Sequence, residues 1–142
     1  MKEFKEEYLD VNSDLDLLSD VLAWFDQFSQ ISLPKNVWLQ CQLALAEGFT
    51  NAVRHAHKNR PKDTPVKIGV VVQRDKIEIK IWDCGAPFDL ASAIEQLSAD
   101  ANLTSEGGRG IKLLYQLADT LDYVHHANGQ NCLTIVKHFL AS

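Results

Sequence analysis

The sequence predicts an α+β fold, a two-layer sandwich in which helices cover one face of a mixed, mostly antiparallel sheet. Two patterns predict it. Segments whose hydrophobic residues alternate with a period of two come in pairs, 66–72 with 77–81 and 121–126 with 131–140, each pair joined by a short polar connection. Segments with helical periodicity lie between these pairs. Hairpins pair antiparallel and helices need a sheet face to cover, which favours this fold over a doubly wound parallel sheet.

The first half of the chain supplies one strand and two helices. Residues 2–10, with Phe4 and Tyr8, are expected to form an edge strand. Asn12 or Ser13 is a suitable N-cap for a helix over about 14–29, whose apolar residues repeat at helical spacing. A second helix is predicted over about 35–58.

The second half supplies the two hairpins and the remaining helices. Arg74-Asp75 connects the strands of the first hairpin, and Asn128-Gly129 is a strong turn signal in the second. A short helix is expected over 91–97, followed by a small, polar stretch over 98–106. A further helix follows Gly110 and ends near Ala118-Asp119.

Length and composition limit the classes of function. The 142 residues, 46% of them hydrophobic, fit a single domain over 1–142 with a real core. The net charge of −5 argues against a general nucleic-acid binder, which needs a basic patch. No segment has the length of a signal-peptide core or a membrane helix, and three widely spaced cysteines fit reduced thiols, so a cytoplasmic location away from membranes is expected.

The helix over 35–58 carries two stripes at about 100° per residue. The apolar stripe consists of Trp38, Cys41, Leu45, Phe49, Ala52 and Ala56. The polar stripe consists of Glu47, Asn51, His55 and Lys58. A carboxylate can serve as a general base, and an Asn oxygen is a hard neutral ligand suited to Mg²⁺. The alternative is an ordinary solvated polar face. Gly48 within this helix is either an imperfection or a place where another group approaches the backbone.

A second constellation stands at the end of the strand over 77–81. Asp83 is followed by Gly85 and Pro87, which turn the chain and bring its backbone close to a neighbour. The Asp83 carboxylate could accept a hydrogen bond from an exocyclic amino group such as that of adenine. The alternative is turn chemistry at a strand end.

The third constellation is Gly107-Gly108-Arg109-Gly110, placed directly before a helical pattern. Glycines let backbone N–H groups face an anion, and a helix N-terminus adds positive partial charge, which suits phosphate. The spacing is neither a P-loop nor a dinucleotide fingerprint, and a flexible hinge is the alternative. His55, His57, His125 and His126 lack the further spaced ligands of a zinc site.

In order and spacing, these constellations resemble the nucleotide-binding boxes of the GHKL ATPase/kinase superfamily, and within it the bacterial anti-sigma-factor serine/threonine kinases. The matching motifs are Glu47-x-x-x-Asn51-Ala52-x-x-His55-Ala56, Asp83-x-Gly85-x-Pro87-Phe88-Asp89, Gly107-Gly108-Arg109-Gly110-Ile111, and Gly129-x-Asn131-x-Leu133-Thr134. The resemblance covers nearly the whole chain. Pro87 stands where other superfamily members carry a further glycine.

The resemblance implies a Bergerat-type, histidine-kinase-like ATPase sandwich that holds ATP and Mg²⁺. Asp83 would recognise adenine with Gly85 in the turn, Asn51 would bind Mg²⁺, and Glu47 would be the catalytic base. Further ATP contacts would come from Gly107, Gly108, Arg109, Gly110 and Ile111, with Thr134 behind the adenine. Residues 89–106 would form a lid.

The resemblance also implies partners. Family members phosphorylate a small anti-anti-sigma protein of the STAS type and sequester a sigma factor, usually as homodimers. The first strand and helix are candidates for a dimer interface. A non-catalytic, nucleotide-responsive binding module is the alternative function, and no role follows for His55, His57 or Lys58.

Overall fold

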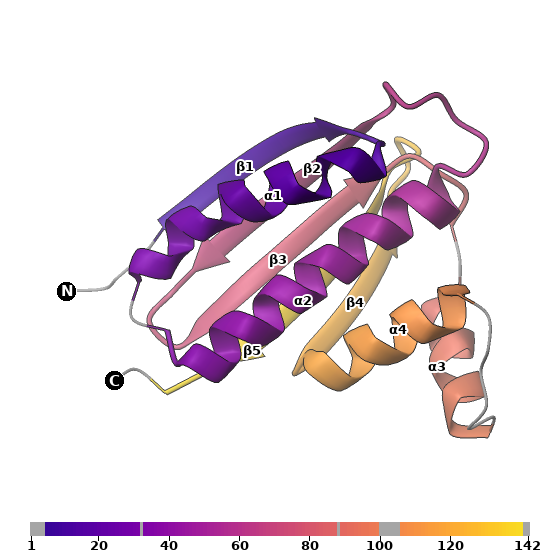
Figure 1. The fold of residues 1–142 in the computed structure, drawn as a ribbon. Coiled ribbons are helices and arrows are strands. Elements are labelled where there is room, and N and C mark those ends of the chain that lie inside the picture. Colours follow the sequence, from indigo (N-terminus) through magenta and orange to yellow (C-terminus); the bar gives the residue numbers. More distant parts are fainter. Residues whose placement is uncertain (1–4, 32, 88, 100–105, 141–142) are drawn as a thin grey trace.

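A five-stranded sheet forms one layer of the molecule, and helices cover one of its faces (Figure 1). The computed structural model describes residues 5–31, 33–87, 89–99 and 106–140. The strands are β1 (Lys5–Asn12), β2 (Pro65–Val72), β3 (Lys76–Asp83), β4 (Thr120–His125) and β5 (Asn131–His138). The spatial order is β1-β2-β3-β5-β4, and every pairing of neighbours is antiparallel. The predicted sandwich and its two hairpins are thus confirmed, although the described sheet is antiparallel throughout rather than mixed.

The helices follow the predicted order. They are η1 (Leu15–Leu17), α1 (Leu18–Phe25), η2 (Asp26–Gln30), α2 (Lys35–Asn51), η3 (Ala52–Ala56), α3 (Leu90–Ala99) and α4 (Glu106–Leu117). In Figure 1, α1 and α2 lie across the same face of the sheet, and α4 runs beside α2. None of the described helices has both the length and the apolar character needed to cross a bilayer.

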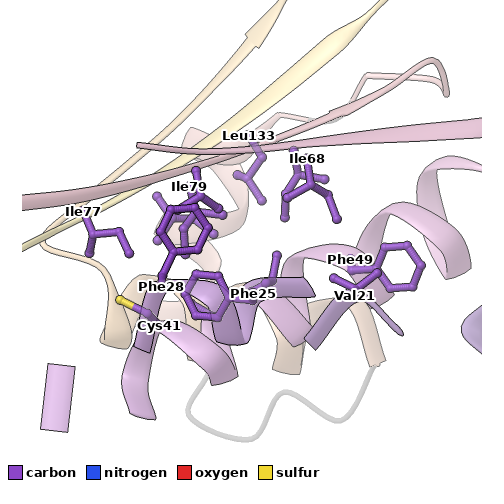
Figure 2. Packing of buried hydrophobic residues seen from close by; sticks show 14 of the residues in the cluster. Val21, Phe25, Phe28, Cys41, Phe49, Ile68, Ile77, Ile79 and Leu133 are labelled. Atoms are coloured by element: carbon purple, nitrogen blue, oxygen red, sulfur yellow. The ribbon is translucent and has the colours of Figure 1, made fainter. Parts of the chain in front are cut away.

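The core lies between this sheet face and the helices. Alternate residues of β2 and β3 point into it, including Ile68, Ile77 and Ile79, and meet aromatic side chains from the helices (Figure 2). Phe25 stacks on Trp38, with ring centroids 4.7 Å apart. The predicted apolar stripe is confirmed: Cys41, Leu45, Phe49 and Ala52 are buried, while Trp38 and Ala56 are partly buried.

The predicted helix over about 14–29 is confirmed in its extent, since residues 15–30 are helical, but it is not one regular helix. The segment is α1 between two 3₁₀ turns, η1 and η2. Neither Asn12 nor Ser13 caps it; the Asp14 carboxylate accepts the Asp16 N–H at 3.0 Å. The Ser13 hydroxyl instead donates to the Thr64 carbonyl oxygen at 2.8 Å, because Ser13 is buried and turned inward.

The predicted helix over 35–58 also changes character near its end. α2 ends at Asn51, and η3 continues it as a π-helix, in which the His57 N–H donates to the Ala52 carbonyl oxygen five residues earlier at 2.9 Å. Isolated π turns are rare and frequently occur at functional sites.

Gly48 is a place of close approach rather than an imperfection. It is buried in α2, and a Cβ atom there would collide with Cδ1 of Ile81 on β3. The glycine therefore allows α2 to pack close to β3, which carries Asp83 at its end.

Candidate nucleotide-binding site

Asp83 is the last residue of β3, and its side chain is held in one orientation. It is buried, with 8% of its surface exposed. Its Oδ1 accepts hydrogen bonds from the Gly85 N–H at 3.0 Å and from Nδ2 of Asn131 at 2.8 Å. The hydrogen bonds that described residues make to this carboxylate both end on Oδ1, which leaves Oδ2 as the acceptor for an incoming donor.

Asn131 is a site residue for which the sequence motif predicted no role. It lies directly opposite Asp83 in the β3–β5 register and is fully buried. Its Nδ2 also donates to the Gly85 carbonyl oxygen at 2.9 Å, and its Oδ1 accepts from Nδ1 of His125 at 2.7 Å. Asn131 therefore ties the strand end and the turn together, and only the strand register could have revealed this.

Thr134 is not beside Asp83. It pairs with Lys80, whereas Asp83 pairs with Asn131 three residues earlier on β5. Side chains alternate between sheet faces, so residues separated by three positions point to opposite sides. Leu133 and Ile135 face the helices and the core, and Thr134 therefore faces away from the helices. This placement contradicts the expectation that Thr134 lies behind an adenine bound at Asp83.

The turn after Asp83 lies against the helical segment that carries the polar stripe. Gly85 is buried, and a Cβ atom there would collide with the Ala56 carbonyl oxygen. Glu47 and Asn51 lie one turn apart in α2 and are partly exposed, while His55 and Lys58 are exposed. Two of the three predicted constellations thus share one corner of the fold.

His57, the residue directly after η3, lies against the same turn. Its ring is buried, with 3% of the residue exposed. Nε2 accepts the Cys84 N–H at 2.9 Å, and Nδ1 lies 2.5 Å from the Ser13 hydroxyl oxygen. Burial lowers the pKa of His57 below its ordinary value, Asp83 opposes this shift, and Arg60 adds to it. No feature of the linear sequence predicted these contacts.

The glycine-rich stretch is part of a helix rather than a turn before one. α4 begins at Glu106, so Gly107–Gly110 form its first turn. The first turn of a helix still presents unpaired N–H groups. The side chain of Arg109 lies outside the described part of the structure. Ile111 is buried, with 5% exposed, and α4 packs beside α2.

The predicted lid begins as a helix. Asp89 caps α3, since its Oδ1 accepts the Ser92 N–H at 3.1 Å and its Oδ2 accepts the Ser92 hydroxyl at 2.9 Å. The rest of the predicted lid, 100–105, lies outside the described residues. A cavity of about 470 Å³ separates the start of α3 from β4, with Pro87 and His125 among its lining residues.

The donors near Asn51 set the kind of metal that would fit. Within the described ranges, no three His, Cys, Asp or Glu residues gather into a metal-binding group. A cation at Asn51 would therefore draw on water and substrate phosphate for most of its ligands. Mg²⁺ binds in this way, through few protein oxygens, so the amide oxygen of Asn51 fits Mg²⁺ rather than a site built wholly from protein.

Known proteins similar to this chain include several serine-protein kinases. Over 83 residues the chain is 30% identical to the serine-protein kinase RsbW of Listeria monocytogenes serovar 1/2a, covering 55% of this chain and 52% of that protein. It is 32% identical over 87 residues to RsbW of Bacillus pumilus, covering 57% and 54%, and 36% identical over 83 residues to RsbW of Staphylococcus aureus, covering 55% and 52%. The chain spans about half the length of these curated relatives.

Two solved structures share the fold. The RsbU and RsbW domains of a Mycobacterium tuberculosis protein match with a TM-score of 0.61 at 13% identity, over 97% of this chain and 34% of that one. The SiaB–SiaC complex of Pseudomonas aeruginosa matches with a TM-score of 0.54 at 11% identity, over 94% and 89%. The family described as Histidine kinase-like ATPase domain matches residues 11–137. With nearly the whole fold inside that match, this chain belongs to the histidine kinase-like ATPase domain family.

Proposed function

We propose that this chain is an ATP-dependent protein serine/threonine kinase that acts as an anti-sigma regulatory factor. It transfers the γ-phosphoryl group of ATP to a hydroxyl of an anti-anti-sigma partner of the STAS type, and it sequesters a sigma factor when that partner is phosphorylated. The single domain over 1–142 carries both activities. The observation that supports this proposal most directly is the buried Asp83 carboxylate, whose Oδ1 accepts two hydrogen bonds while Oδ2 is left to accept one from a ligand. The turn after Asp83 packs against the helical segment that carries Glu47 and Asn51.

The chemistry of adenine supports this assignment. Its exocyclic amino group is a donor, and a carboxylate oxygen held in a buried site is an acceptor that cannot turn away. A buried acceptor that loses its partner costs about 1–3 kcal/mol, so such a site discriminates between purines that donate and purines that accept at this position.

Phosphoryl transfer depends chiefly on positioning and charge neutralisation. Asn51 is proposed to hold Mg²⁺, which neutralises charge on the phosphates when bound. Gly107, Gly108, Arg109 and Gly110 are proposed to contact the phosphates from the first turn of α4, where the helix dipole favours an anion. Glu47, one turn before Asn51, is proposed as the base that takes the proton from the incoming hydroxyl.

The names of the relatives support the kinase half of the proposal, since the matched segment of each belongs to a serine-protein kinase. A homodimer and a cytoplasmic location are proposed with it. The partners bind as proteins, and the acidic balance of 14 basic to 19 acidic residues gives no reason to expect direct contact with nucleic acid.

The test separates nucleotide binding from transfer. The protein is used to capture partners from its native cell with and without ATP, and the captured proteins are incubated with γ-labelled ATP and Mg²⁺. Glu47→Gln should retain ATP affinity in calorimetry and lose label transfer. Transfer at the wild-type rate by this variant would remove Glu47 from its role, and ATP binding without transfer by the wild type would leave the non-catalytic module.

Asp83→Asn provides the isosteric test of purine recognition. The new amide oxygen can keep the Gly85 and Asn131 hydrogen bonds, while its NH₂ group replaces Oδ2 and meets the amino group of adenine. ATP should bind about 5- to 150-fold more weakly, from a cost of about 1–3 kcal/mol. GTP, which presents a carbonyl oxygen there, should lose much less. Glu78→Gln on β3 is the matched control, because Glu78 points to the opposite sheet face.

A further inference from the structure

His57 is a buried histidine whose two ring nitrogens both bind groups from distant parts of the chain. Ser13 follows β1, and Cys84 follows β3. Cys84 stands between Asp83, the proposed purine acceptor, and Gly85, which packs on the backbone of Ala56 beside His57. The imidazole is therefore the direct support of the purine-binding turn from the η3 side.

The partners of the ring decide its protonation state. The Cys84 backbone N–H can only donate, so Nε2 must be the acceptor and Nδ1 must carry the proton. Nδ1–H then donates to the hydroxyl oxygen of Ser13, which in turn donates to the Thr64 carbonyl oxygen at 2.8 Å. The Cys84 thiol also lies 3.5 Å from Nε2 and can donate to it. The Cys84 N–H has an acceptor on the ring only while the imidazole is neutral.

We propose that His57 is a positioning residue for the nucleotide site, and that its neutral ring makes nucleotide affinity sensitive to mild acid. This inference rests on the proposed function. Protonation of Nε2 would set an N–H against the Cys84 N–H and break the support of the turn. The Asp83 carboxylate, one residue away in the same turn, would then lose its fixed direction, and the nucleotide would bind more weakly.

Burial, rather than the charged groups around the ring, favours the neutral state of His57. Burial has the largest effect and lowers the pKa of His57. The Asp83 carboxylate from β3 favours the cation, and Arg60 from the following loop disfavours it. His125, from β4, also supports the turn, but it does so as a donor to Asn131.

The tautomer itself can be measured without any ligand. Nitrogen-15 NMR of the imidazole rings in the full chain should show His57 as the neutral Nδ1–H tautomer at neutral pH, with Nε2 unprotonated. Finding the Nε2–H tautomer or the imidazolium there would overturn the inference, because neither can accept from the Cys84 N–H.

The nucleotide test uses ATP as the probe over about pH 5 to 8, the range in which histidines change charge. Wild type is compared with His57→Gln, whose amide oxygen can accept from Cys84 without titrating, and with His57→Leu, which removes the acceptor. The exposed His126→Gln is the matched control. Protonation of ATP cancels because every variant meets the same ligand.

At neutral pH, His57→Leu should bind ATP roughly two- to tenfold more weakly, the loss of one hydrogen bond, and His57→Gln should restore the affinity. As the pH falls, the ATP affinity of the wild type and of His126→Gln should decrease by similar factors, and that of His57→Gln should decrease less. Parallel titration of wild type and His57→Gln would overturn this inference alone. Failure of the wild type to bind ATP at any pH would overturn the proposed function and this inference with it.

Discussion

Replacing Gly85 with alanine tests whether the contact between the Asp83–Gly85 turn and η3 positions the proposed nucleotide site. The added Cβ would collide with the Ala56 carbonyl oxygen and lie 2.8 Å from its Cα. These are backbone atoms, and the Ala52–His57 hydrogen bond of 2.9 Å holds the π turn that contains them. The collision can be relieved only by moving the turn, the helix end or both.

Overpacking of this kind costs about 1–3 kcal/mol, from a total stability of about 5–15 kcal/mol for a domain. We expect Gly85→Ala to lower the free energy of unfolding in urea by that amount with an unchanged m-value. Displacement of the turn should also weaken ATP binding measured by calorimetry on the folded protein.

Gly48→Ala is the control for this experiment. Its Cβ would meet Cδ1 of Ile81, the end of a flexible side chain, and alanine gains about 1 kcal/mol over glycine in helix propensity. We therefore expect a smaller change in stability and no change in ATP affinity. The reasoning is refuted if Gly85→Ala has the same free energy of unfolding and the same ATP affinity as the wild type. It is also refuted if Gly48→Ala weakens ATP binding as strongly as Gly85→Ala does.

Three further predictions concern the same corner and the core beneath it. Asn131→Asp replaces a donor to Asp83 with a second carboxylate, and should reduce both the free energy of unfolding and ATP affinity, in urea and calorimetric titrations, with partial recovery on mild acidification. Burial raises the pKa of the Cys41 thiol to about 12, so a thiol-specific reagent at neutral pH should modify the partly exposed Cys84 in the native protein and Cys41 only after unfolding. Since the pKa of His57 is lower in the folded state than its ordinary value of 6.5, the unfolded chain binds the extra proton first; the free energy of unfolding should fall as the pH drops below about 6.5, and this slope should be shallower in His57→Gln.

The sheet was predictable because its signal is local and repeated. Val66, Ile68, Val70 and Val72 occupy every second position of this segment, and every one of them is buried in β2. The close approach at Gly48 was only half predictable. The sequence marks the glycine, but the residue that approaches it, Ile81, comes from a strand more than thirty residues later.

The glycine-rich stretch shows that helix propensity alone does not determine where a helix begins. Gly107, Gly108 and Gly110 each disfavour helix by about 1 kcal/mol relative to alanine, so the sequence predicts a turn there. The structure nevertheless includes them in α4. Packing of the same helix downstream, where Leu114 is fully buried in the core, offsets that local preference.

The position of His57 was unpredictable because the period of the helix changes. At about 100° per residue, positions 52 and 57 of an α-helix diverge by about 140°. A π turn has more residues per turn, so His57 comes back toward the side on which Ala52 is buried. A pattern read with a constant period therefore places the ring on the wrong side of the helix.

Thr134 and Asn131 show why the neighbour of Asp83 on β5 could be identified only from the structure. Both follow the Asn128-Gly129 turn, and both carry polar groups suited to hydrogen bonding, so the sequence gives no preference between them. The strand register decides: Asp83 pairs with Asn131, and an offset of three residues puts Thr134 on the other face. The partners of the Asp83–Gly85 turn are separated from it by 27 residues at His57 and by 48 at Asn131. The conformation of this turn thus depends on long-range contacts that form only when the π turn and the β3–β5 register are both in place. Single substitutions at His57, Gly85 or Asn131 should therefore change nucleotide affinity by changing the position of the Asp83 carboxylate.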